Sequence, residues 1–156
     1  FKKLMKTLQL NYSKAVNFDQ TMTLMKRIIS FSDKRLAAFI ANSFREIFSY
    51  LSIDTEILMS SDIPKDNSLR GKDKILQICE ILGADTYYNA IGGQNLYDKK
   101  EFSEHGIVLN FVDTIPKVYS QLRTKEFVPY LSMIDVLMNN TKDEVNDLLD
   151  SFCVRY

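Results

Sequence analysis

The middle of the chain alternates short β-rich runs with helix-like segments, and this order constrains the fold more than any other feature of the sequence. The runs Thr55–Met59, Thr86–Asn89 and Ile107–Phe111 have the composition of strands. Between them, Lys72–Leu82 and the segment 98–105 have helical hydrophobic spacing. Because parallel strands need crossover connections, this order predicts an α/β fold with a short parallel sheet (strands near residues 55–59, 86–89 and 107–111) and crossover helices.

Helical patterns flank this middle on both sides. Hydrophobic spacing predicts helical segments over residues 1–50 and 130–154 around a βαβ-type core over 51–115, all within one α/β domain or a fragment of one. The longest apolar stripe is expected to be buried, because a chain of this size must cover such a surface. The stripe consists of Leu36, Phe39, Ile40, Phe44, Ile47, Phe48 and Leu51. The last helix is expected to bury Val145, Leu148, Leu149 and Phe152.

Glycines and capping residues mark the ends of these helices. Gly83 and Gly106 follow helical patterns, at positions that favour a left-handed residue. Three pairs have the spacing of a capping box, namely Asp98 with Glu101, Ser132 with Asp135, and Thr141 with Glu144. The candidate caps of the earlier helices are Asn17 or Asp19 for the second and Ser32 for the third.

Composition excludes several classes of protein. The 156 residues are 46% hydrophobic and 26% charged, which fits one globular domain. The 20 basic and 20 acidic residues balance, whereas a protein that binds nucleic acid through its phosphates normally has a basic excess. No apolar run approaches the ~20 residues that span a membrane. We therefore expect neither nucleic acid nor a membrane as a partner.

Metal ligands and disulfides are scarce. Two cysteines and one histidine are too few for a zinc site, and Cys79 lies in an apolar pattern that is typical of a core residue. We expect a reducing, cytoplasmic location and no metal or other cofactor. The chain begins at Phe1 inside a helical pattern, so we also expect that a preceding segment belongs to the protein.

The most informative candidate site is the loop after the second predicted strand. Two glycines there would let backbone N–H groups approach a ligand, and the carboxyl end of a parallel strand is where α/β proteins bind ligands. Neutral side chains around them suit a polyhydroxylated or amide-bearing ligand. The candidate residues are Asn89, Gly92, Gly93, Gln94, Asn95 and Tyr97. The alternative is a turn that needs two residues of positive φ, with its polar side chains in water.

Two further candidates involve charged residues. Arg70 and Lys72 flank a glycine at a predicted helix N-terminus, which favours an anion such as a phosphorylated small molecule, although ordinary surface charge is the alternative. Ser132 and Asp135 could act as a nucleophile and an acid, but their spacing also fits a helix cap. The N-terminus of that helix can still bind an anion, so both residues remain candidate ligand-binding residues. His105 is either a solvated residue at a helix C-terminus or a catalytic base. These patterns identify no catalytic residue.

The same segments resemble the WbqC-like protein family. The similarity runs in order through Lys72–Gly83, Thr86–Asp98, the step from Phe102 to Ile107, and Phe127–Leu137, and so covers nearly the whole chain. Only the Gly92-Gly93 loop and the Phe127–Asp135 motif can be carried over as functional residues.

The resemblance implies a bacterial protein of O-antigen or other surface-polysaccharide synthesis. The implied activity is transfer of an acyl or aminoacyl group to a nucleotide-linked amino sugar. The alternative is a non-catalytic binding or assembly subunit of the same pathway. Members of the family usually carry a further segment before the part that matches here, and the functional residues of that segment would lie outside this chain. The expected partners are a sugar nucleotide or another phosphorylated small molecule, together with a second copy of the chain or a partner enzyme.

Overall fold

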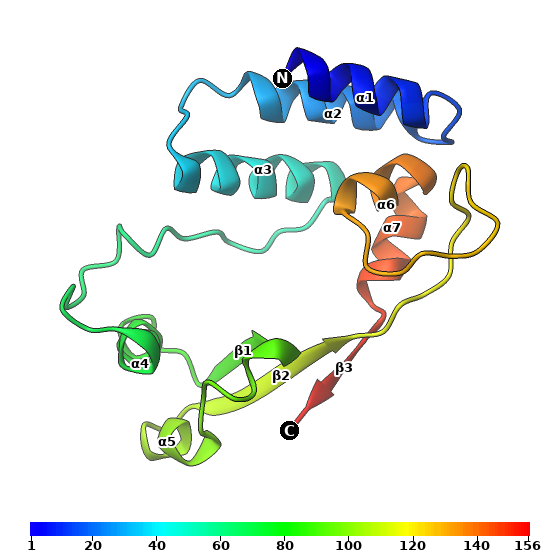
Figure 1. The fold of residues 1–156 in the computed structure, drawn as a ribbon. Coiled ribbons are helices and arrows are strands. Elements are labelled where there is room, and N and C mark those ends of the chain that lie inside the picture. Colours follow the sequence, from blue (N-terminus) through cyan, green and yellow to red (C-terminus); the bar gives the residue numbers. More distant parts are fainter. The chain divides into compact units, whose positions relative to one another are not determined.

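The computed structural model describes residues 1–156 (Figure 1). Contacts between residues divide the chain into two compact units. The first, here called the helical unit, contains Phe1–Ile57 and Pro116–Ser151; the second, the sheet unit, contains Leu58–Ile115 and Phe152–Tyr156. The greater part of both predicted helical flanks therefore lies in one unit, and most of the predicted βαβ-type core lies in the other.

The helical unit buries one face of each of its five helices. These are α1 (Lys2–Tyr12), α2 (Phe18–Ser30), α3 (Leu36–Leu51), α6 (Met133–Asn139) and α7 (Lys142–Leu149) (Figure 1). Leu24, Leu137 and Met138 are almost completely buried at the centre of the shared core. The helical spacing of the sequence is confirmed here, because each helix contributes residues of its apolar stripe to this cluster.

The stripe on α3 is buried only in part. Leu51 is fully buried and Phe39 and Ile47 pack against the core, as predicted. Leu36 and Phe44, in contrast, are 75% and 50% exposed. The prediction that the whole stripe is core is therefore wrong. The stripe is wider than the surface that α2 and α7 can cover, so its outer edge lies in solvent within this structure.

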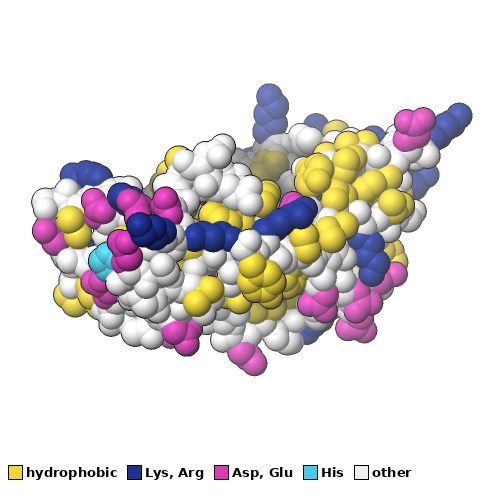
Figure 2. Space-filling model, turned by 90° about the horizontal axis from the view of Figure 1, so that it is seen from below, with side chains coloured by type: hydrophobic (Ala, Val, Ile, Leu, Met, Phe, Trp, Pro, Cys, Tyr) yellow, Lys and Arg dark blue, Asp and Glu magenta, His cyan; other side chains and the backbone are white.

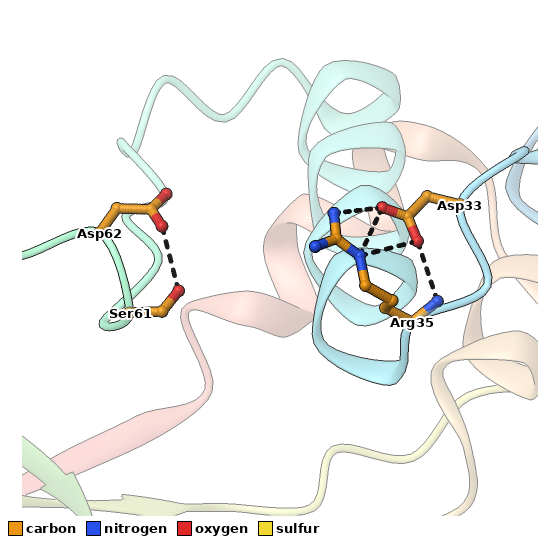
Figure 3. A network of polar contacts seen from close by, with 4 residues as sticks. All are labelled: Asp33, Arg35, Ser61 and Asp62. Atoms are coloured by element: carbon orange, nitrogen blue, oxygen red, sulfur yellow. Dashed lines mark hydrogen bonds and ion pairs between the residues drawn. The ribbon is translucent and has the colours of Figure 1, made fainter.

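The starts of α2 and α3 use different polar contacts from those predicted. Asn17 stands before α2 but makes no capping hydrogen bond; its side-chain amide instead donates to Tyr50 Oη at 2.8 Å and to the Leu137 carbonyl at 2.9 Å. Before α3 the side chain that accepts hydrogen bonds at the helix start is that of Asp33, and not that of the predicted cap Ser32. The Asp33 carboxylate accepts from the backbone and the guanidinium of Arg35 (Figure 3), which lowers the pKa of Asp33.

The sheet unit places two helices on a three-stranded sheet. Its elements are α4 (Gly71–Ile81), β1 (Thr86–Ala90), the 3-10 turn η1 (Ile91–Gly93), α5 (Lys99–Glu104), β2 (Val108–Thr114) and β3 (Phe152–Arg155). The strand order is β1-β2-β3, with β1 parallel and β3 antiparallel to β2. The α/β class, the two central strands and the helix that connects them are confirmed.

The third strand is not the predicted one. Thr55–Met59 forms no strand, and the chain is irregular from there through the polar loop in which Ser61 Oγ donates to Asp62 (Figure 3). The edge of the sheet is formed instead by Phe152–Arg155, so the prediction that Phe152 belongs to the last helix is wrong. Helix α7 ends at Leu149, and the residues that follow pair with Phe111–Thr114. The sheet is therefore mixed rather than purely parallel.

The core of the sheet unit lies between the sheet and its helices. Leu76 and Cys79 from α4, Phe102 from α5, and Leu109 and Phe111 from β2 form one buried cluster. Gly83 (φ 64°) and Gly106 (φ 72°) end the two helices in the left-handed region, as predicted. No helix of either unit is both long enough and apolar enough to cross a lipid bilayer.

Candidate functional site

A wide hollow of about 760 Å³ opens beside α5 in the sheet unit, and we call it the α5 hollow. Its polar side chains come from the loop after η1 and from two helices, and the buried Phe111 of β2 also borders it. The lining residues are Lys72, Gln94, Asn95, Leu96, Tyr97, Asp98, Lys99, Glu101 and Phe111. A hollow of this size can hold a ligand of the size of a sugar phosphate or larger.

The turn η1 carries the chain from the end of β1 to this hollow. The Gln94 amide donates to the Ile91 carbonyl at 3.2 Å, and the Leu96 amide donates to the Gly93 carbonyl at 2.9 Å. Gly93 is buried, and a Cβ at this position would lie 3.1 Å from the side-chain atoms of Asn89. Neither Gly92 nor Gly93 has a positive φ. The glycine at 93 therefore serves a close approach to Asn89, and the turn of two positive-φ residues, the alternative from the sequence, does not occur.

The charges around the α5 hollow are balanced, with two lysines and two carboxylates. Lys72 forms an ion pair with Glu101, and this hydrogen bond raises the pKa of Lys72. Asp98 caps α5 by accepting from the Lys100 amide at 2.7 Å. Lys99 makes no ion pair; its Nζ lies 6.0 Å from the centroid of the Phe111 ring. Lys99 is therefore the lysine of the α5 hollow that can bind an anion without first breaking an ion pair.

The structure brings four of the candidate residues, Lys72, Gln94, Asn95 and Tyr97, to the wall of the α5 hollow. Asn89 lies behind this wall, where its amide donates to Tyr87 Oη at 3.3 Å. Gly92 and Gly93 shape the preceding turn and do not line the hollow.

Arg70 does not contribute to the α5 hollow. Its guanidinium folds back on its own loop and donates to the carbonyls of Asn67 at 2.6 Å and Leu69 at 2.9 Å. These bonds hold the loop that leads into α4. In this arrangement Lys72 lines the α5 hollow and Arg70 does not.

Ser132 and Asp135 belong to the helical unit and have separate roles. Ser132 Oγ accepts from the Ile134 amide at 3.2 Å, so this residue caps α6 as predicted. The Asp135 carboxylate is buried and accepts from Tyr12 Oη at 2.8 Å and Tyr119 Oη at 2.7 Å. The prediction that Asp135 completes a capping box is wrong, because two phenols hold its carboxylate away from the helix start.

A model of the WbqC-like protein family matches residues 1–147 of this chain. The chain belongs to the WbqC-like protein family. No curated protein and no solved structure matches it.

The cluster around Asp135 organises a loop of this WbqC-like protein. Gln121 Nε2 donates to the Asp135 carboxylate at 3.3 Å, and the same amide exchanges hydrogen bonds with the backbone of Val128. One buried carboxylate thus connects α1, α6 and the segment that includes the Phe127–Asp135 motif. With no cation against it, Asp135 depends on its three uncharged donors.

Sequence reasoning missed two residues of the α5 hollow that matter for its chemistry. Lys99 follows the cap of α5 and reads as an ordinary surface lysine. Phe111 lies in the core stripe of β2, and nothing local indicates that this buried residue borders a hollow. The spacing of Glu101 fits a capping box, but its carboxylate pairs with Lys72 from another helix.

The lone histidine of the WbqC-like chain lies outside both candidate sites. His105 follows α5, and its Nδ1 lies 2.6 Å from Glu80 Oε1 on α4. Figure 2 shows the histidine in cyan among acidic side chains in magenta. This partly exposed pair links the two helices of the sheet unit.

The tyrosines that hold Asp135 predict a loss of stability at alkaline pH. Burial and the hydrogen bond to Asp135 raise the pKa of Tyr12 and of Tyr119 from the usual 10.0 to about 12. The folded state therefore keeps both phenols protonated more strongly than the unfolded state does. Their contribution to stability is complete below pH 10 and is lost as the pH rises through 12. Urea unfolding midpoints across this range measure the loss.

The matched control is the double variant Tyr12→Phe/Tyr119→Phe, which has no phenol to ionise at either position. We expect its midpoint to fall less steeply than that of the parent protein over the same interval. Equal slopes in the two proteins would contradict the assignment of the alkaline loss to these two phenols.

Proposed function

We propose that the α5 hollow binds a nucleotide-linked amino sugar. The protein would be a cytoplasmic transferase that places an acyl or aminoacyl group on this sugar during synthesis of a bacterial surface polysaccharide. The observation that carries the proposal is the lining of the hollow, in which the neutral groups of Gln94, Asn95 and Tyr97 stand beside two lysines. Membership of the WbqC-like family supports the choice of pathway.

The chemistry of the lining suits such a ligand in two ways. Side-chain amides and a phenol both donate and accept hydrogen bonds, which matches sugar hydroxyls and an acylated amine. The two lysines supply positive charge for phosphate, and Lys99 is not engaged by a carboxylate.

The proposed reaction is acyl transfer to nitrogen. The amine of the sugar attacks the carbonyl carbon of an activated acyl donor, an ester or a thioester. The new amide bond forms, the bond from the acyl carbon to its carrier breaks, and the proton that the amine gives up ends on the oxygen or sulfur of the released carrier. Within this chain, the α5 hollow would contribute to rate by holding the amine in position.

Thermal shift and calorimetric titration with a panel of nucleotide-linked amino sugars test the binding step. We expect at least one member to raise the melting temperature, since a ligand selective for the folded state stabilises it. The variant Gln94→Ala/Asn95→Ala removes two hydrogen-bonding groups from the hollow and should weaken that ligand by about 10- to 100-fold. The control Asn67→Ala removes an exposed amide outside the hollow and should bind like the parent protein.

Two results would contradict the proposal. The first is that no nucleotide-linked amino sugar shifts the melting temperature. The second is equal loss of binding in Gln94→Ala/Asn95→Ala and Asn67→Ala. If the first result were accompanied by stable co-purification of another enzyme of the pathway, the non-catalytic assembly role would be favoured instead.

A further inference from the structure

A separate hollow of about 220 Å³ lies within the helical unit. The end of α6, one face of α7 and residues 117–120 line it, and we call it the α6–α7 hollow. It shares no lining residue with the α5 hollow. It is smaller than the roughly 300–1,000 Å³ pockets that hold drug-sized ligands, so it suits a smaller molecule.

Two nearly buried asparagines at the end of α6 line this hollow. Asn139 and Asn140 are only 9% and 5% exposed. Asn139 Nδ2 donates to the Asp135 carbonyl at 2.9 Å, and Asn140 Nδ2 donates to the Val136 carbonyl at 2.8 Å. A carbonyl can only accept, so these bonds fix which end of each side-chain amide is the NH₂ group and which is the oxygen.

The side-chain oxygens of both asparagines are open acceptors. Neither Oδ1 accepts a hydrogen bond within the chain, and neither belongs to the unpaired side-chain atoms that the fold seals from solvent, which are Asn42 Nδ2 and Asn110 Oδ1. Both oxygens can therefore be reached from outside, and the cavity that both residues line is the α6–α7 hollow. Because each NH₂ group is occupied, the pair offers only acceptors, held in fixed directions. Such acceptors suit a ligand that donates hydrogen bonds, and a protonated amine is a strong donor.

Two free charges of opposite sign line the same hollow. Lys117 and Asp147 form no ion pair and no side-chain hydrogen bond, either with each other or with other residues. The carboxylate of Glu144, in contrast, is occupied in the cap of α7 at Thr141. The hollow thus offers one carboxylate for an ammonium group and one lysine for an anionic group.

A divalent metal ion fits this lining less well than an amine. Hard cations take several carboxylate and carbonyl oxygens. Only one carboxylate of the hollow is free, and the chain has no group of three or more acidic, histidine or cysteine side chains that could hold a metal. Lys117 would also repel a metal ion, whereas it attracts the anionic end of a zwitterion.

We infer that the α6–α7 hollow binds a free α-amino acid. The ammonium group donates to the Asn139 and Asn140 oxygens and pairs with Asp147, while the carboxylate of the ligand pairs with Lys117. Leu148 gives the hollow an apolar wall for a small side chain. The inference goes beyond the proposed function, because it assigns a different ligand to a different unit of the chain.

Calorimetric titration of the full chain with amino acids and their blocked forms tests this inference. We expect L-alanine to bind, and L-tryptophan to bind at least about tenfold more weakly because its side chain exceeds the room in the hollow. N-acetyl-L-alanine has no ammonium group and L-alanine methyl ester has no carboxylate, so each should lose about tenfold or more in affinity. No binding of L-alanine at millimolar concentration would overturn the inference.

Two substitutions of exposed, unpaired residues assign the binding to this hollow. Asp147→Asn should weaken L-alanine by about tenfold or more, whereas Asp143→Asn, which changes an exposed carboxylate of α7 outside the hollow, should bind like the parent protein. Lys117→Met should weaken L-alanine but not its methyl ester, and the control Lys125→Met should weaken neither. Parent-like binding of L-alanine by both Asp147→Asn and Lys117→Met would overturn the inference.

Asn140→Ala tests the open amide oxygen. The substitution also removes the hydrogen bond to the Val136 carbonyl, so the melting temperature of the variant is first measured without ligand. L-alanine at a concentration that raises the melting temperature of the parent protein should then raise that of the variant much less. An equal rise in both proteins would contradict the role of this amide in binding.

Two further results separate this inference from its alternatives. If calcium chloride alone binds through Asp147 and L-alanine does not bind, the hollow is a metal site and the inference is refuted. If L-alanine binds through Asp147 while no nucleotide-linked amino sugar binds, the inference stands and the proposed function is contradicted. If a nucleotide-linked amino sugar binds through Gln94 and Asn95 but L-alanine does not bind, the proposed function stands and the inference is refuted.

Discussion

Replacing Phe102 with alanine is expected to destabilise the sheet unit by about 3–5 kcal/mol, the largest effect that we predict for a single substitution. Phe102 is completely buried and contacts both layers of its unit. Its ring stacks on Tyr87 at a centroid distance of 5.6 Å and meets Tyr97 edge-on at 5.7 Å. Alanine would leave a cavity between α5 and the sheet, where surrounding side chains can relax only in part.

Urea unfolding followed by near-ultraviolet circular dichroism measures this loss. The signal depends on ordered aromatic rings, and Tyr87 and Tyr97 would line the cavity. Phe44→Ala is the matched control, since Phe44 is half exposed and should cost no more than about 1 kcal/mol. Similar losses in the two variants would contradict the central packing role of Phe102. Tyr97 lines the α5 hollow, so Phe102→Ala is also expected to weaken any ligand held there.

Replacing Asp135 with alanine is expected to destabilise the helical unit by about 2–4 kcal/mol. The substitution leaves Tyr12 Oη, Tyr119 Oη and the Gln121 amide without their common acceptor. Hydrogen bonds to a charged group are stronger than neutral ones, and buried donors that lose a partner also lose their hydration. Asp135→Asn keeps one carbonyl oxygen as an acceptor, so we expect its free energy of unfolding to fall by roughly half as much as that of the alanine variant.

Equilibrium unfolding of the two Asp135 variants measures these losses, with Asp147→Ala as the control for removal of an exposed carboxylate from the same unit. The order of stability should be the control, then the asparagine variant, then the alanine variant. An alanine variant as stable as the control would show that the phenols find other partners, and would contradict the role of Asp135 in tying the Phe127–Asp135 segment to α1.

Local signals in the sequence identify the helices and the two central strands. Gly83 and Gly106 terminate helices, and Thr141 forms a complete capping box with Glu144, as its spacing predicts. These features depend on residues within one helical turn of each other. They can therefore be read without knowledge of the rest of the chain.

The third strand could not be predicted in the same way. Thr55–Met59 and Phe152–Arg155 both have strand-like residues, but only the second pairs with β2. A strand needs a partner, and the choice of partner depends on contacts between residues that are distant in sequence. The same reason explains Asp135, whose spacing fits a cap and whose phenol partners come from α1 and from a loop.

The candidate site shows a similar division between local and distant information. Gln94, Asn95 and Tyr97 are polar residues of one loop, so local composition indicates them. Lys99 and Phe111 come from a helix and a strand that only the fold brings to the hollow.

The late position of β3 in the chain has a consequence for biosynthesis. A ribosome makes Leu58–Ile115 before Pro116–Ser151, and the residues of β3 follow only after both. The helical unit can therefore fold on the nascent polypeptide before β3 is available, and during that time one edge of β2 has no antiparallel partner. During that interval the edge is open to mispairing with other newly made chains, and pairing with Phe152–Arg155 ends that exposure.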